Sequence, residues 1–148
     1  MPFYTVITED DFLSDQQRDA IAQQICEIHC EVNQVPPAFV RTFFITFPKG
    51  SGFTAGKPAA PAAITCLMRT GHDTETKGRL LKRLWAMFQD ATGVPTDQLV
   101  VVLQEVSGSN AMEMGAIMPD PGNDGALWPR KGIDRRGRGG CRALVAIT

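Results

Sequence analysis

The chain repeats its own pattern at an offset of 59 residues, and this repeat limits the choice of fold more than any other feature. Similarity at one fixed spacing indicates a duplicated supersecondary unit. We therefore predict two tandem copies of one unit, at about residues 2–47 and 61–106. The aligned pairs are Pro2 with Pro61, Ile21 with Leu80, Ile25 with Leu84, Ile28 with Met87, and Val35-Pro36 with Val94-Pro95.

Each copy is predicted to fold as a β-α-β unit, because short runs of β-branched and apolar residues flank a segment with helical periodicity. The two strands of such a unit run parallel through a right-handed crossover. Two units would form a four-stranded mixed sheet with both helices on one face, which is an α+β fold. The predicted strands are residues 3–8, 39–47, 62–68 and 98–106.

Capping residues define the two predicted helices. The first begins at about Ser14, whose hydroxyl can cap the helix together with Gln17 three residues on. The second covers about residues 74–92, and Gly93 followed by Pro95 ends it. The Gly/Pro/Ala-rich residues 48–61 are interpreted as a loop between the two copies.

The face of the predicted sheet away from the helices has no cover within the chain. We expect apolar strand residues such as Phe43, Ile45, Val100 and Val102 to be divided between the two sides of the sheet. An exposed apolar patch of that size usually marks an interface. The sequence therefore predicts an oligomer.

The composition is that of a single globular domain, with 43% hydrophobic and 21% charged residues among 148. No run of about 18 apolar residues occurs, and the N-terminus lacks a basic region followed by an apolar one. We expect neither a membrane span nor a signal peptide, and a cytoplasmic location. The domain is predicted to cover residues 1–128.

Residues 129–148 are predicted to form a basic, irregular tail. Within it, residues 130–142 carry six Arg or Lys and one Asp, although the formal net charge of the whole chain is −1. Basic residues without interleaved aromatic side chains are more typical of a solvated tail than of a nucleic-acid site. We predict no nucleic-acid partner.

Metal sites are weakly indicated. The four cysteines form no Cys-x-x-Cys pair, so reduced thiols are expected. Cys26, His29 and Cys30 share one helix face and raise the alternative of a zinc site, but cysteine in a helix is usually a small buried hydrophobe. Residues 120–125 lack the alternating oxygen ligands of a calcium loop and are interpreted as a turn. We predict no metal and no cofactor.

The predicted topology brings His29, Arg69 and Glu113 close to Pro2. The first helix spans roughly 22 Å and the first strand roughly 20 Å, so His29 returns to the level of Pro2. The third strand runs opposite to the first and ends at Arg69 near the same edge. The fourth strand runs parallel to the third and delivers the segment containing Glu113 there.

This group of residues can move a proton on a bound acid. Arg69 can hold a carboxylate by a forked pair of hydrogen bonds. Removal of Met1 would make Pro2 the N-terminus, and an α-amine has a reference pKa of about 7.7–8.0. Burial near a cation lowers that pKa and gives a neutral amine that acts as a base. A retained Met1 would turn the Pro2 nitrogen into an amide without basicity.

With these residues, the chain resembles the cis-3-chloroacrylic acid dehalogenase group of the tautomerase superfamily. The resemblance covers roughly residues 2–128 and includes Pro2-Phe-Tyr, the helix ending at His29, the Arg69 segment and Lys77-Gly78. It also includes the run Met112-Glu-Met-Gly-Ala-Ile-Met-Pro-Asp-Pro-Gly-Asn-Asp-Gly-Ala-Leu-Trp128. The resemblance implies a tautomerase/MIF-like subunit that assembles as a homotrimer, with the amino-terminal proline as the catalytic group.

The resemblance also implies roles for individual residues. Pro2 would be catalytic, His29 would bind or polarise the substrate, and Glu113 would orient or activate water. Arg69 would bind the substrate carboxylate. Two positions depart from the family pattern: His72 stands where a second substrate-binding arginine is expected, and Val102 stands where a water-positioning tyrosine is expected.

Three functions are compatible with this pattern. The first is a keto–enol tautomerase acting on small 2-oxo acids with a neutral Pro2 amine. The second is a hydratase or hydrolytic dehalogenase of 3-halo or acetylenic acids, in which Pro2 is protonated and Glu113 activates water. The third is a trimeric binding protein without catalysis, which an absence of Pro2-dependent turnover would favour. Because Val102 and His72 weaken the hydration machinery, we expect a tautomerase with weak dehalogenase activity.

Overall fold

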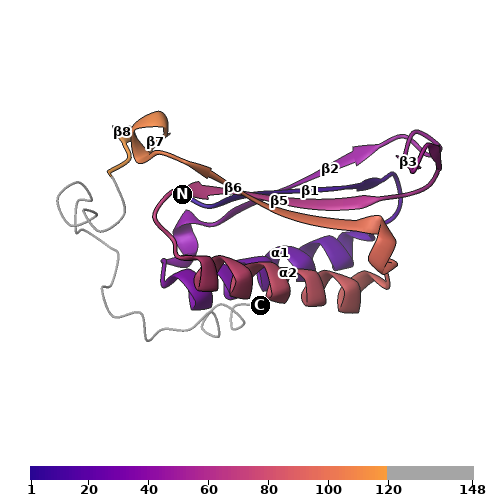
Figure 1. Cartoon of the computed structure of the whole chain (residues 1–148), viewed down its shortest axis with the longest axis horizontal. Coiled ribbons are helices and arrows are strands. Elements are labelled where there is room, and N and C mark those ends of the chain that lie inside the picture. Colours follow the sequence, from indigo (N-terminus) through magenta and orange to yellow (C-terminus); the bar gives the residue numbers. More distant parts are fainter. Residues whose placement is uncertain (120–148) are drawn as a thin grey trace.

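A four-stranded sheet lies over two helices in the computed structural model, which describes residues 1–119 (Figure 1). The strand order is β2-β1-β5-β6. β1 and β2 are parallel, β5 and β6 are parallel, and β1 and β5 pair antiparallel in the centre. The predicted α+β fold of two β-α-β units is confirmed. The strands are β1 (Phe3–Glu9), β2 (Arg41–Phe47), β5 (Ala62–Arg69) and β6 (Leu99–Val106).

Both helices begin and end at residues with the expected chemistry. α1 (Asp15–Asn33) starts with the predicted capping box, in which Ser14 and Gln17 bond each other's backbone N–H groups. α2 (Thr74–Thr92) has Asp73 as its N-cap and ends at Gly93, which adopts the left-handed conformation. The limits of the second helix are as predicted.

β2 begins at Arg41, two residues later than predicted, because the proline-containing segment before it forms the short 3₁₀ helix η1 (Pro37–Phe39). The Phe39 and Val40 N–H groups donate to carbonyls within this turn at 3.1 and 3.0 Å. Arg41 is therefore the first residue of β2 and pairs with Phe3 in register. A similar turn, η2 (Thr96–Gln98), precedes β6.

The prediction of a plain loop over residues 48–61 was wrong, because this segment contains the hairpin β3 (Phe53–Thr54) and β4 (Lys57–Pro58). A second hairpin, β7 (Met112–Glu113) and β8 (Ala116–Ile117), occurs 59 residues later, beyond the 3₁₀ turn η3 (Gly108–Asn110). Each hairpin turns through two residues with positive φ, which matches the twist of paired strands. The duplication thus includes the hairpins, which lie at opposite ends of the sheet (Figure 1).

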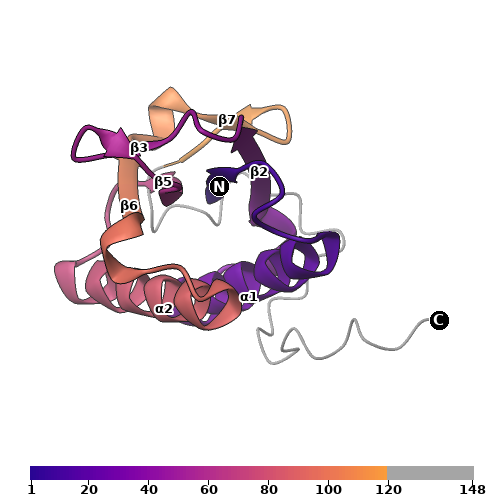
Figure 2. The same ribbon diagram turned by 90° about the vertical axis from the view of Figure 1, so that its right-hand side faces the viewer.

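The core lies between the sheet and the helices, and the other sheet face is open (Figure 2). Tyr4, Val6, Ile64 and Cys66 face the helices and are fully buried. The expected division of four apolar residues between the two sides was wrong, because all of them are exposed on the open face. Alternation along each strand places them opposite the buried residues. Their exposed fractions are 51% for Phe43, 51% for Ile45, 54% for Val100 and 43% for Val102.

Two predictions concern segments that the structure leaves undescribed. The basic tail at residues 129–148 and the turn at residues 120–125 lie outside residues 1–119. The domain boundary at residue 128 therefore stays a prediction. Within residues 1–119, neither helix has the length and hydropathy needed to cross a membrane.

Candidate active site

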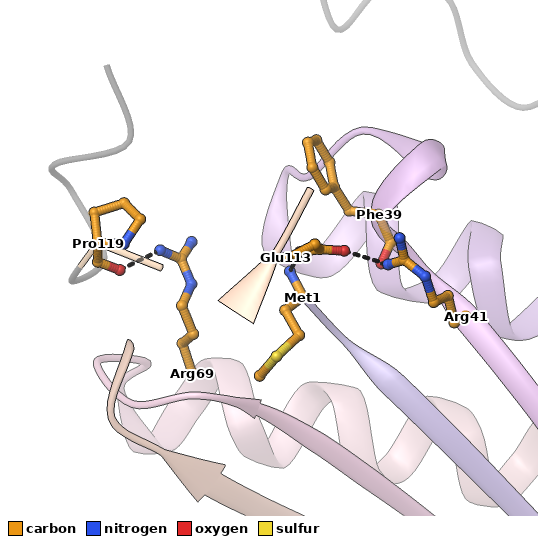
Figure 3. A network of polar contacts seen from close by, with 6 residues as sticks. All are labelled: Met1, Phe39, Arg41, Arg69, Glu113 and Pro119. Atoms are coloured by element: carbon orange, nitrogen blue, oxygen red, sulfur yellow. Dashed lines mark hydrogen bonds and ion pairs between the residues drawn. The ribbon is translucent and has the colours of Figure 1, made fainter. Parts of the chain in front are cut away.

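The N-terminal amine lies beside a buried carboxylate where β1 begins (Figure 3). The Met1 nitrogen is 3.2 Å from Oε2 of Glu113, whose side chain is only 5% exposed. Nη1 of Arg41 donates to Oε1 of the same carboxylate and also to the Phe39 carbonyl, at 3.2 Å in the second case. Figure 3 shows Met1 and Glu113 between Arg69 on one side and Arg41 on the other.

The surroundings of the amine favour its neutral form. Burial lowers the pKa of the Met1 amine, and the charge of Glu113 opposes this by stabilising the ammonium form. The cations Arg69 and Arg41 lower the pKa further, so the net direction is downward. An amine with a lowered pKa is deprotonated in a larger fraction of molecules near neutral pH, and the neutral amine is a base.

Arg69 is the last residue of β5 and is held at the same edge. Its Nη1 donates to the Pro119 carbonyl at 2.6 Å. Gly108 packs against that carbonyl so closely that a Cβ at this position would lie 2.5 Å from the oxygen. The segment that contacts Arg69 therefore requires a glycine at residue 108.

His29 lies beneath the sheet, on α1, and is 2% exposed. Burial lowers the pKa of His29 to about 3, and the charges of His72 and the N-terminal amine act in the same direction. Its ring is therefore neutral near pH 7. His29 is therefore a hydrogen-bonding group without charge near that pH.

The hydroxyl of Tyr4 selects which nitrogen of His29 carries the proton. Tyr4 Oη lies 2.7 Å from Nδ1 of His29, and burial raises the pKa of the Tyr4 hydroxyl, which keeps its proton. The Cys66 thiol also lies near this hydroxyl, but a sulfur is the weaker acceptor. A Tyr4 hydroxyl that donates to Nδ1 leaves the hydrogen of His29 on Nε2, which lies 3.2 Å from the side-chain amide nitrogen of Asn33.

The two departures from the family pattern lie in different places. His72 is half-buried before α2, and burial lowers its pKa, with the Arg69 charge adding to the effect while the nearby Glu105 opposes it. His72 also contributes to the lowered pKa of His29, so the two histidines lie near each other. Val102 pairs with Thr65 on the open face, outside this group in the single described chain.

A cavity of about 420 Å³ opens beside the amine, which is within the usual range for small ligands. One part of its wall is charged and the other is apolar, with Phe3 and Phe43 packed edge to face at 5.3 Å. The lining residues are Met1, Phe3, Arg41, Phe43, Met112, Glu113 and Met114. Removal of Met1 would therefore enlarge this cavity next to Pro2.

Arg41 was not predicted to belong to the site. Its one sequence signal is a single charge directly before the predominantly apolar residues 42–47. For metal binding, residues 1–119 contain no group of three His, Cys, Asp or Glu side chains arranged to hold an ion. The zinc alternative finds no support there, since the sulfurs of Cys26 and Cys30 only approach each other at 4.0 Å.

Comparisons with known proteins agree on one superfamily. A family model described as "Putative oxalocrotonate tautomerase enzyme" matches residues 1–132. Native Ps01740 is 32% identical with a TM-score of 0.74, and the match covers 75% of this chain and 99% of that chain. N1, a member of the cis-3-chloroacrylic acid dehalogenase family, is 25% identical with a TM-score of 0.77, over 81% of this chain and 85% of N1.

A more distant similarity concerns the fold alone. The symmetric trimer of a fused 4-OT has a TM-score of 0.72 at 17% identity, over 78% of this chain and 94% of that chain. No curated protein matches the sequence.

Proposed function

The chain belongs to the oxalocrotonate tautomerase-like family matched over residues 1–132, and from this premise we propose that it is a tautomerase of small 2-oxo acids whose base is the Pro2 amine. The observation that carries the proposal is the position of the N-terminal amine, which is half-buried beside Glu113 and two arginines, where desolvation and the two cations lower its pKa. Removal of Met1 would transfer this environment to the Pro2 nitrogen, one residue or about 3.8 Å further along.

Three residues of the site have roles in the proposed reaction. In the enol-to-keto direction, the neutral Pro2 amine takes the proton of the enol hydroxyl, and the resulting ammonium group returns it to the third carbon of the acid. Arg69 binds the carboxylate as a permanent cation. The Nε2–H group of His29 donates to the carboxylate or to the carbonyl oxygen. No net change of protonation occurs in the cycle.

Replacement of Arg69 by Gln tests the proposed carboxylate site. We expect KM for the enol of a 2-oxo acid to rise by about tenfold or more, with a smaller change in kcat, because Arg69 would contribute chiefly to binding. Initial-rate kinetics measure both constants. Arg83→Gln is the matched control, since Arg83 forms an exposed ion pair with Glu31 between the helices. An unchanged KM in Arg69→Gln would show that the carboxylate binds elsewhere.

We further propose that the protein is a homotrimer; the fused 4-OT that shares its fold is a symmetric trimer. The open sheet face carries the exposed apolar side chains that such an association would bury. Light scattering should give about three times the 16.1 kDa of one chain. Ile45→Asp places a charge on the open face and should release monomers, whereas Lys82→Asp on the outer side of α2 should not. A 16 kDa particle at micromolar concentration would rule out the trimer.

Hydration of 3-halo or acetylenic acids is the second candidate function. Oε2 of Glu113 is buried and faces the amine, which is a suitable place for a water molecule between the acid and the base. Protonated Pro2 would then act as the acid. The valine at residue 102 supplies no hydroxyl for such a water, which is why we rank tautomerisation first.

A further inference from the structure

The two carboxylate oxygens of Glu113 have different surroundings. Oε1 accepts a hydrogen bond from the guanidinium group of Arg41. Oε2 lies 3.2 Å from the terminal nitrogen, at ion-pair distance, and a hydrogen bond between the amine and this carboxylate stabilises the ammonium form. Glu113 therefore contacts Arg41 with one oxygen and the terminal amine with the other.

Arg41 connects this carboxylate to the strand that carries the amine. Its backbone N–H donates to the Pro2 carbonyl at 3.2 Å, and its guanidinium group donates to the Phe39 carbonyl at the end of η1. The same residue thus contacts Pro2 with its backbone and Glu113 with its side chain. The relative position of Pro2 and Glu113 is determined in part by one arginine on the neighbouring strand.

We propose that Arg41 is a positioning residue, which binds Oε1 of Glu113 so that Oε2 is left to face the terminal amine and the bound substrate. This inference rests on the proposed role of Pro2. Arg41, whose side chain is 45% exposed, also compensates the charge of the Glu113 carboxylate, which is only 5% exposed, and its removal would leave that buried charge with one partner fewer. The positive charge of Arg41 also lowers the pKa of the amine.

Charged and titratable groups from four elements interact with the amine. Glu113 on β7 stabilises its protonated form, whereas Arg69 on β5 and Arg41 on β2 destabilise it. His29 on α1 and Cys66 on β5 also interact with the terminal charge. Without Arg41, one destabilising cation is lost, and only Arg69 still opposes the effect of Glu113 on the amine. The amine should then keep its proton to a higher pH, and less of the neutral base should be present on the acidic side.

The test compares Arg41→Met and Arg41→Lys with the wild-type protein, and Arg83→Met serves as the control for loss of an exposed Arg–Glu pair. Protein labelled with ¹⁵N-proline reports the protonation of the terminal amine by NMR, and kcat/KM for a 2-oxo acid enol is measured over the same pH range. We expect the Arg41→Met titration to move to higher pH. Its kcat/KM should fall by about tenfold near pH 6 and recover near pH 9. A merely structural defect would lower the rate at every pH.

Arg41→Lys keeps the charge but loses the forked donor, so its curve should lie between those of Arg41→Met and the wild type. If Arg41→Met does not fold, the same displacement must appear, reduced, in Arg41→Lys. Titration and rate curves of a folded variant that coincide with those of the wild type would overturn the inference. If the titration shifts but turnover does not depend on Pro2, the positioning role stands and the proposed function is wrong.

Discussion

Replacement of Pro2 by Ala should reduce enol-to-keto turnover by at least about tenfold, even in protein from which Met1 has been removed. An alanine terminus supplies a primary amine that rotates about its N–Cα bond, whereas the proline ring fixes the nitrogen relative to β1. A base that is no longer held in line with the substrate loses much of its effect, because proton transfer requires hydrogen-bond distance. The loss should appear in kcat rather than in KM, since Arg69 would still bind the acid.

The measurement is the disappearance of the enol of phenylpyruvate, followed for both proteins at several substrate concentrations. Thr5→Ala is the control, because Thr5 lies on the same strand and is half-buried without belonging to the proposed site. Both variants must be shown to lack Met1. Equal kcat for Pro2→Ala and the wild type would refute the role of the proline amine.

The second large effect concerns the choice of reaction. We expect the unmodified protein to ketonise a 2-oxo acid with greater catalytic efficiency than it dehalogenates cis-3-chloroacrylate. Hydration needs a positioned water, and Val102 offers only methyl groups, so one hydrogen bond is missing at a cost on the order of 10²-fold in rate. Burial lowers the pKa of His72, so its imidazole supplies no permanent cation near neutral pH. Enolisation requires neither contribution.

The double replacement Val102→Tyr with His72→Arg should therefore raise dehalogenation by about 10²-fold. Val102 lies on the open face, so a tyrosine there is expected to act only in the assembled trimer. Val100→Tyr with His72→Arg is the matched control, because Val100 is exposed on the same face of β6. Chloride release measures the reaction. No gain in the double variant, or a wild type that already prefers the halogenated acid, would show that these positions do not determine the reaction.

Much of the fold could be predicted because the internal repeat indicates that one supersecondary unit occurs twice. Two strand–helix–strand units at one offset determine the order and direction of the strands once the crossovers are right-handed. The hairpins were missed although they recur at the same offset. Their strands have two residues each, too short to show alternation, and their turns begin with Ala55 and Met114 at positive φ, where glycine or asparagine is the expected signal.

The site was predictable only in part. His29, Arg69 and Glu113 could be expected near the terminus from topology, and all three influence or contact its amine. The position of Arg41 could not be predicted. It depends on the start of β2 two residues later than expected and on the pairing of Arg41 with Phe3. The neutral state of His29 depends on burial beneath the sheet, which no local sequence signal reports.

The central claim is that the reacting group is the amine of Pro2, and intact-mass spectrometry of an active preparation tests it most directly. The account predicts that the catalytically active molecules lack Met1 and begin with Pro2. In a form that retains Met1, the Pro2 nitrogen is an amide and its turnover should be lost. A homogeneous preparation that carries Met1 and converts the 2-oxo acid at the same rate as the processed protein would contradict the account.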